Sequence, residues 1–128
     1  MTISNYLEPR ILDHILTSST TPFVTTTDIF ASLHTGDPGE TGTASPLAST
    51  PRFSVHMGVA VSSTNSNDTT ASVVCSATGT VTFIGLWDGT STALANHLWS
   101  GALTASRVVA NVGDSVTLAV NGLTVTLD

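Results

Sequence analysis

Apolar residues near the N-terminus recur at the spacing of one helical face, and the charged residues between them fall largely elsewhere. The apolar residues are Leu7, Ile11, Leu12, Ile15 and Leu16. A Ser- and Thr-rich stretch that closes with Pro22 follows, and such residues favour caps and turns over helix. The pattern predicts one helix over about residues 7–17.

After about residue 23 the apolar period changes to two, which is typical of half-buried strands. Residues 53–61 alternate strictly, whereas residues 80–89 are apolar on both faces, as expected of a central strand. Residues 63–70 are polar and predict a loop. The segments predicted as strands here are 28–35, 53–61, 71–77, 80–89, 97–104 and 106–112.

The C-terminal segment predicts a β-hairpin. Asn121-Gly122 suits a two-residue type I′ turn, whose central residues both need positive φ. The apolar pairs across that hairpin would be Val120 with Leu123, Leu118 with Val125, and Val116 with Leu127. Turn chemistry and hydrophobic pattern thus indicate the same register.

One helix followed by about seven short strands predicts a mainly β fold. The expected architecture is an antiparallel β-sandwich or barrel with the N-terminal helix on an edge or end. A chain of 128 residues is near the usual size of one domain, so residues 1–128 are expected to form a single domain with the sandwich over about 23–128.

The chain is poor in charge. Only 9% of its residues are Asp, Glu, Lys or Arg, against about 25% in ordinary soluble domains, and it has no lysine. Its mean hydropathy is +0.30. Ser and Thr supply the polar surface instead, so we expect much of the exterior to be covered by neighbouring protein chains.

Several classes of partner are disfavoured by the same composition. A net charge of −6, with Arg10, Arg52 and Arg107 as the permanent cations, would repel nucleic acid. The sequence contains no run of about 18 apolar residues, the length that a membrane-spanning helix needs. The first residues lack the pattern of a secretory signal, so we expect synthesis in a cytoplasm.

The long irregular segment Gly36–Pro51 is a candidate site for a cation or a partner. Asp37 and Glu40 could offer oxygen ligands to calcium. Asp37-Pro38-Gly39 is, however, also the sequence of a type II turn, with proline where φ is fixed and glycine where φ is positive. We favour the turn and expect no metal or cofactor.

Catalysis is not indicated. The chain lacks a G-x-S-x-G nucleophile motif, and its four histidines are too scattered to identify a general base or a metal site. His34 and His56 fall within strand patterns. The single cysteine, Cys75, occupies an inward strand position and is expected to behave as a small apolar residue.

Two tryptophans and one loop are further candidates for partner contact. Trp87 and Trp99 could stack on a sugar, although core packing is the commoner role of such residues. Asp88 begins the loop Asp88–His97, which follows a strand end. The residues predicted to contact partners are Asp37, Pro38, Glu40, Trp87, Asp88 and Trp99.

The order of five segments resembles a family of small structural proteins of tailed bacteriophages. The segments are "SNYLEPRILDHIL", "IFASLHTGDPGETG", "GTVTFIGLWDG", "HLWSGAL" and "NVGDSVTLAVNGLTVTLD". Members of that family are labelled tail fibre or minor tail proteins, and capsid decoration is a further possible position. The resemblance implies a non-enzymatic virion component that contacts other virion proteins and copies of itself. The alternative is a carbohydrate-binding module that recognises a host-surface glycan.

Overall fold

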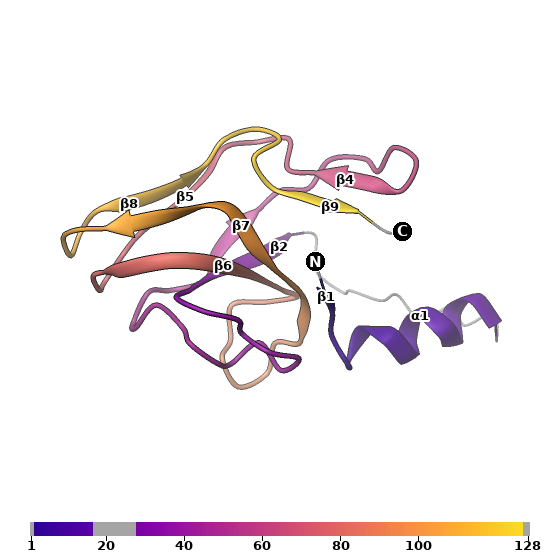
Figure 1. Ribbon diagram of the computed structural model, residues 1–128. Coiled ribbons are helices and arrows are strands. Elements are labelled where there is room, and N and C mark those ends of the chain that lie inside the picture. The colour runs from indigo at the N-terminus through magenta and orange to yellow at the C-terminus, as the bar shows by residue number, and fades with distance from the viewer. Residues whose placement is uncertain (1, 17–27, 127–128) are drawn as a thin grey trace.

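The computed structural model describes residues 2–16 and 28–126 and forms a mainly antiparallel β fold with one helix (Figure 1). The predicted fold class is confirmed, as a sandwich and not a closed barrel. The predicted helix end at residue 17 and the sandwich start at residue 23 lie outside the described residues. In chain order the elements are β1 (Thr2–Ile3), α1 (Leu7–Leu16), β2 (Ile29–His34), β3 (Phe53–Val55), β4 (Thr64–Ser66), β5 (Ala71–Val74), β6 (Gly79–Trp87), β7 (His97–Val109), β8 (Ser115–Leu118) and β9 (Thr124–Thr126).

The first layer is a five-stranded sheet with the order β1-β7-β6-β2-β3. β6 lies at its centre, as its apolar residues on both faces predicted. The segments 97–104 and 106–112 were expected to form two strands, and this was wrong because β7 runs unbroken from His97 to Val109. The register against β6 jumps between Ala102 and Arg107, so a bulge takes up the polar residues that suggested a break.

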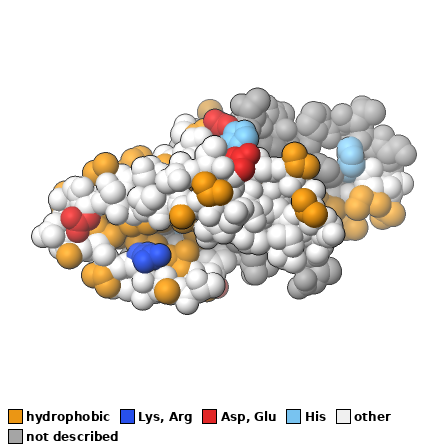
Figure 2. All heavy atoms as spheres, turned by 90° about the horizontal axis from the view of Figure 1, so that it is seen from above, with side chains coloured by type: hydrophobic (Ala, Val, Ile, Leu, Met, Phe, Trp, Pro, Cys, Tyr) orange, Lys and Arg blue, Asp and Glu red, His pale blue; other side chains and the backbone are white. Residues whose placement is uncertain are grey.

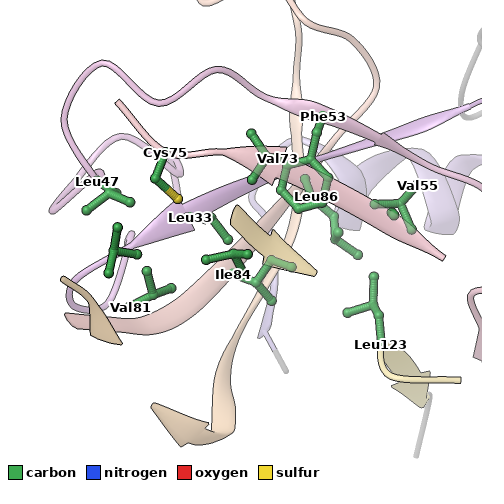
Figure 3. Close-up of a cluster of buried hydrophobic side chains, with 14 residues drawn as sticks. Leu33, Leu47, Phe53, Val55, Val73, Cys75, Val81, Ile84, Leu86 and Leu123 are labelled. Atoms are coloured by element: carbon green, nitrogen blue, oxygen red, sulfur yellow. The ribbon is translucent and has the colours of Figure 1, made fainter. Parts of the chain in front are cut away.

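The second layer consists of two small sheets, β5-β8 and β4-β9. Figure 1 shows β5 and β8 lying above β6 and β7. One apolar core fills the space between the layers (Figure 3). Its fully covered members include Ala31, Val55, Val81 and Cys75, each 0% exposed, and the inward position predicted for Cys75 is therefore confirmed.

The predicted C-terminal hairpin is wrong. β8 pairs with β5, and β9 pairs with β4. Asn121 does have a positive φ of 59°, but the turn is closed one residue earlier, by the Gly122 N–H donating to the Ala119 carbonyl at 2.8 Å. The chain therefore leaves one small sheet and enters the other.

Asn67 explains this change of partner. Its side chain is 0% exposed and donates through Nδ2 to the carbonyls of Ala119 and Thr69, each at 2.8 Å. Its Oδ1 accepts from the Leu123 N–H at 2.8 Å. The amide thus occupies the place where the two arms of a hairpin would meet, and it satisfies their backbone groups itself.

The strand predicted over 53–61 is only partly correct. β3 ends at Val55, and Val59 and Val61 are 92% and 73% exposed. The Gly58 N–H donates to the Ser66 carbonyl at 2.8 Å, so the chain turns back through β4 within the stretch predicted as a loop. The alternation of apolar and polar residues continues to Val61, but the pairing of β3 with β2 ends at Val55.

No helix in residues 2–16 and 28–126 is long and apolar enough to cross a membrane.

Candidate interaction surfaces

The two loops predicted to contact partners, 36–51 and 88–97, lie over the outer face of the five-stranded sheet and meet at Trp87. The Trp87 ring is 4% exposed, and its centroid lies 4.9 Å from that of His97. The guanidinium of Arg52 lies 3.4 Å from the Trp87 ring centroid. Arg52 Nη1 donates to the carbonyls of Ser91 and Gly89 at 2.9 and 3.2 Å, so its side chain holds the second loop in place.

Gly42 brings the first loop against this cluster. Its φ is +70°, and a Cβ at this position would come 2.5 Å from His97 Cδ2 and 2.7 Å from Trp87 Cζ2. Both the positive φ and the close approach require glycine here. The His97 Nδ1 lies 3.1 Å from the Glu40 carbonyl, which holds the same loop in place.

A buried chain of hydrogen bonds runs beneath the loops. Trp87 Nε1–H donates to Ser32 Oγ at 2.7 Å, and Ser32 Oγ lies 2.7 Å from His34 Nε2. His34 Nδ1 lies 2.8 Å from the carbonyl of Ala44. A neutral His34 protonated on Nδ1 satisfies every one of these contacts, with the Ser32 hydroxyl donating to Nε2.

Burial keeps both histidines of this face neutral. Desolvation lowers the pKa of His34 and of His97 below the usual 6.5, against smaller opposing effects of the Ala44 and Glu40 carbonyls. Partial burial also lowers the pKa of Arg52, although Asp88 opposes the shift. Arg52 is therefore the cation of this cluster, and the carboxylates of Asp88 and Glu40 lie near enough to act on it and on His97.

The Ser32–His34 contact has the distance of a nucleophile and a general base, but its surroundings favour a structural role. His34 is 1% exposed, and the lone pair of Ser32 Oγ already accepts the indole proton. Ser32 and His34 are two residues apart in β2, so the alternation of a strand places both on one face of the sheet. The other members of the network come from distant segments, which is why the sequence did not indicate it.

A pocket of about 430 Å³ opens beside this cluster. Arg52 and Trp87 form part of its wall, with Thr43, Thr90 and Thr92 around them. Arg52 covers one face of the Trp87 ring and His97 approaches the same indole, so Trp87 does not present a bare stacking platform.

The acidic residues of the first loop lie at its exposed turn. Gly39 has the positive φ of 68° that the predicted turn required, and its N–H donates to Asp37 Oδ1 at 2.8 Å. Pro38 is buried, whereas Asp37 and Glu40 are exposed. Within residues 2–16 and 28–126, no three His, Cys, Asp or Glu side chains are grouped so as to hold a metal.

The remaining predicted contact residues have separate positions. Asp88 closes its own loop by accepting from the N–H and the Nδ2 of Asn96 at 2.6 and 2.7 Å. Trp99 pairs with Leu86, on the core face of the sheet. It lines an apolar pocket of about 320 Å³ with Met57 and Val125. The structure does not bring Trp87 and Trp99 together.

The helix α1 presents a surface that the sequence did not lead us to expect. The predicted apolar stripe was expected to pack on the sandwich, yet Leu12, Ile15 and Leu16 are 57%, 68% and 75% exposed. Leu7 alone among the residues of α1 is buried, at 2% exposed. Figure 1 shows α1 reaching away from the sheets, and Figure 2 shows hydrophobic side chains gathered on it.

A family model described as podophage GP4 fiber I protein gp80 matches residues 2–126. The chain belongs to this family of phage fibre proteins. The resemblance to tailed-phage structural proteins is thereby confirmed, and membership implies a component of the virion associated with other virion proteins. No curated protein matches the chain.

Proposed function

We propose that the chain is a non-enzymatic structural subunit of a phage fibre, and that it attaches to another virion protein through the apolar side of α1. The observation that carries this proposal is the exposure of Leu12, Ile15 and Leu16 on a helix that stands away from the sandwich. Membership of a fibre family supplies the setting. Amphipathic helices of this kind bind by laying their apolar side into a groove of a partner.

The three side chains contribute a substantial part of the free energy that a specific contact needs. Burying one large aliphatic side chain contributes about 1.5–3 kcal/mol, so three such residues contribute up to about 9 kcal/mol before the entropy lost on association is subtracted. A micromolar complex needs about 8 kcal/mol net, so other contacts would have to contribute as well. Substitution of Leu12, Ile15 or Leu16 should change the stability of the isolated subunit little, because these side chains are already exposed to solvent.

Phage particles carrying Leu12→Gln with Ile15→Gln test the proposal. We expect the variant to fold normally, by circular dichroism, and to be lost from purified particles by quantitative mass spectrometry. Glu8→Gln, an exposed change on the same helix, is the matched control and should be incorporated as the wild type is. Normal incorporation of the double variant would refute attachment through α1.

The position on the particle is part of the same proposal. We place the subunit on the tail fibre and not among the capsid decoration proteins, because the matching family is one of fibre proteins. Cryo-electron microscopy of particles labelled through an exposed cysteine, such as Thr92→Cys, should show label at the tail. Label distributed over the capsid would reverse this assignment.

Glycan recognition is the rival function, and the geometry supports it less well. Arg52 covers Trp87, and Trp99 faces the core side of the sheet. A glycan array on the purified protein, repeated with Trp99→Ala and Arg52→Ala, distinguishes glycan recognition from a purely structural role. We expect no binding to the array; binding that either substitution abolishes without unfolding would favour the glycan-binding module.

A further inference from the structure

A groove of about 470 Å³ opens between β7 and β8, along one side of the sandwich. Its base reaches the core residues Leu33 and Ile84, which are 4% and 2% exposed. Arg107 is the one charged side chain among the described residues that line it. Figure 2 shows a hollow with hydrophobic side chains within it and a basic side chain at its edge.

One wall of the groove is the open edge of β8. The Cys75 N–H donates to the Asp114 carbonyl at 2.8 Å, and Val73 lies opposite Val116. Alternation along an antiparallel ladder then directs the backbone groups of Ser115 and Thr117 away from β5. Within the described part of the chain β8 pairs with β5 alone, so this edge is available to another strand.

β9 also has an open edge, because within the described residues it pairs with β4 alone. Its inward side chain, Val125, packs partly against the core, and so does Leu118 of β8. The sequence around Asn121-Gly122 places these two residues opposite each other in one register. Asn67 prevents that pairing within one copy. Asn67 and the Gly122 N–H also occupy the Ala119 carbonyl, so pairing between copies would use the outward backbone groups of Ser115 and Thr117.

We propose that β8 of one copy pairs antiparallel with β9 of a second copy, with Leu118 opposite Val125 of the second copy. The two small sheets would then join in the order β5-β8-β9-β4 across the interface. This register keeps the inward faces of both strands on one side, so each copy retains its core contacts. The inference rests on the proposed structural role, which requires contacts between protein chains.

The contact joins two different surfaces, and each copy keeps one of the two available for the next. Such a head-to-tail interface produces a ring when its rotation closes and a filament when it does not. Both outcomes suit a fibre subunit. The groove has Arg107 as its one charged lining residue and apolar side chains at its base, so an uncharged strand such as Thr124–Thr126 can enter it without burying a second charge.

Cross-linking in purified protein tests the register. In a Cys75→Ala background, Thr117→Cys is mixed with Thr126→Cys and oxidised; these positions face each other in the proposed pairing. Directly opposite Cβ atoms lie about 4.5–5.5 Å apart, whereas diagonal neighbours lie about 7–8 Å apart. We expect several-fold more heterodimer than from Thr117→Cys mixed with Thr124→Cys, and equal yields would overturn the proposal.

Oligomeric mass gives a second, independent measurement. Ala119→Lys places a charge in the groove, and we expect it to weaken association about tenfold or more by light scattering. Val74→Lys is the matched control, since Val74 is 59% exposed on the neighbouring strand and does not line the groove. A wild-type chain that stays monomeric at the highest attainable concentration would also refute the pairing.

The two proposals fail separately. Leu12→Gln with Ile15→Gln should abolish attachment to the particle and leave the cross-link between Thr117→Cys and Thr126→Cys intact. Loss of the cross-link with normal incorporation of the subunit into particles would refute only the strand pairing.

Discussion

At the scale of single residues, the structure depends on polar side chains that are buried with partners. Asn67 and His34 are 0% and 1% exposed, and each holds distant backbone segments together. The alternation of β2 places Ser32 and His34 on one face, so half of the network beneath the loops could be anticipated. The Trp87 indole and the Ala44 carbonyl come from other segments, and no local pattern in the sequence indicates such long-range partners.

Replacing Ser32 tests how much this network contributes to stability. Ser32→Ala leaves the Trp87 indole N–H and His34 Nε2 without their partner. We expect the free energy of unfolding to fall by about 3 kcal/mol, since each unsatisfied buried group costs about 1–3 kcal/mol. Urea denaturation measures this. Ser72→Ala, at an exposed strand position, should change stability by less than about 0.5 kcal/mol; equal effects would contradict a role for the network.

The histidines predict two opposite pH responses. Burial lowers the pKa of His34 and His97, so the unfolded chain takes up protons first below about pH 6.5 and stability should fall with pH there. The hydrogen bond to Asp68 raises the pKa of His56, so its contribution is present below about pH 6.5 and is lost as pH rises through its folded pKa.

Histidine NMR titrations measure these shifts directly. We expect the His34 and His97 signals to titrate with a pKa below the usual 6.5 and the His56 signal with a pKa above it. Asp68→Asn should move the His56 titration down and leave the other two in place. A common pKa near 6.5 for all three would show that the buried network does not form.

At the scale of elements, the sequence predicted whether a segment is helix or strand better than it predicted which strands pair. The apolar residues of β6 identified a central strand, and the periodicity of residues 7–16 identified a helix. Pairing failed at β8 and β9 because one buried amide, far away in the sequence, competes with the turn. Local patterns record which face of an element is apolar, but they do not record which neighbour covers it; α1 shows the same limit.

Asn67 is accordingly expected to determine the path of the chain between β8 and β9. Asn67→Ala removes three hydrogen bonds of 2.8 Å and leaves the N–H of the buried residue Leu123 without its acceptor. We expect a loss of about 3 kcal/mol and faster hydrogen exchange at the Leu123 amide. Asn111→Ala, an exposed control, should do neither. Unchanged exchange at Leu123 would show that the turn holds without Asn67.

At the scale of the whole molecule, the shortage of charge is matched by exposed apolar side chains on several surfaces. Val59, Leu94 and Val108 are 92%, 84% and 74% exposed, in addition to the apolar side of α1. A subunit of this composition gains by covering surface against neighbours, and membership of a fibre family gives it neighbours to bind. The same features imply that association depends on apolar burial and backbone pairing, with little contribution from charge.

Ionic strength distinguishes these sources of association. Attraction between opposite charges weakens as the Debye length shortens from about 10 Å at 0.1 M salt to about 3 Å at 1 M, whereas apolar burial and strand pairing do not. We therefore expect the self-association constant, from sedimentation equilibrium, to change by less than about threefold over that range. The Ala119→Lys variant places a cation in a groove that an uncharged strand would cover, so its weakened association should persist at both salt concentrations. Steep weakening of the wild-type association with salt would mean that its few charged residues hold the copies together, contrary to a contact formed by β8 and β9.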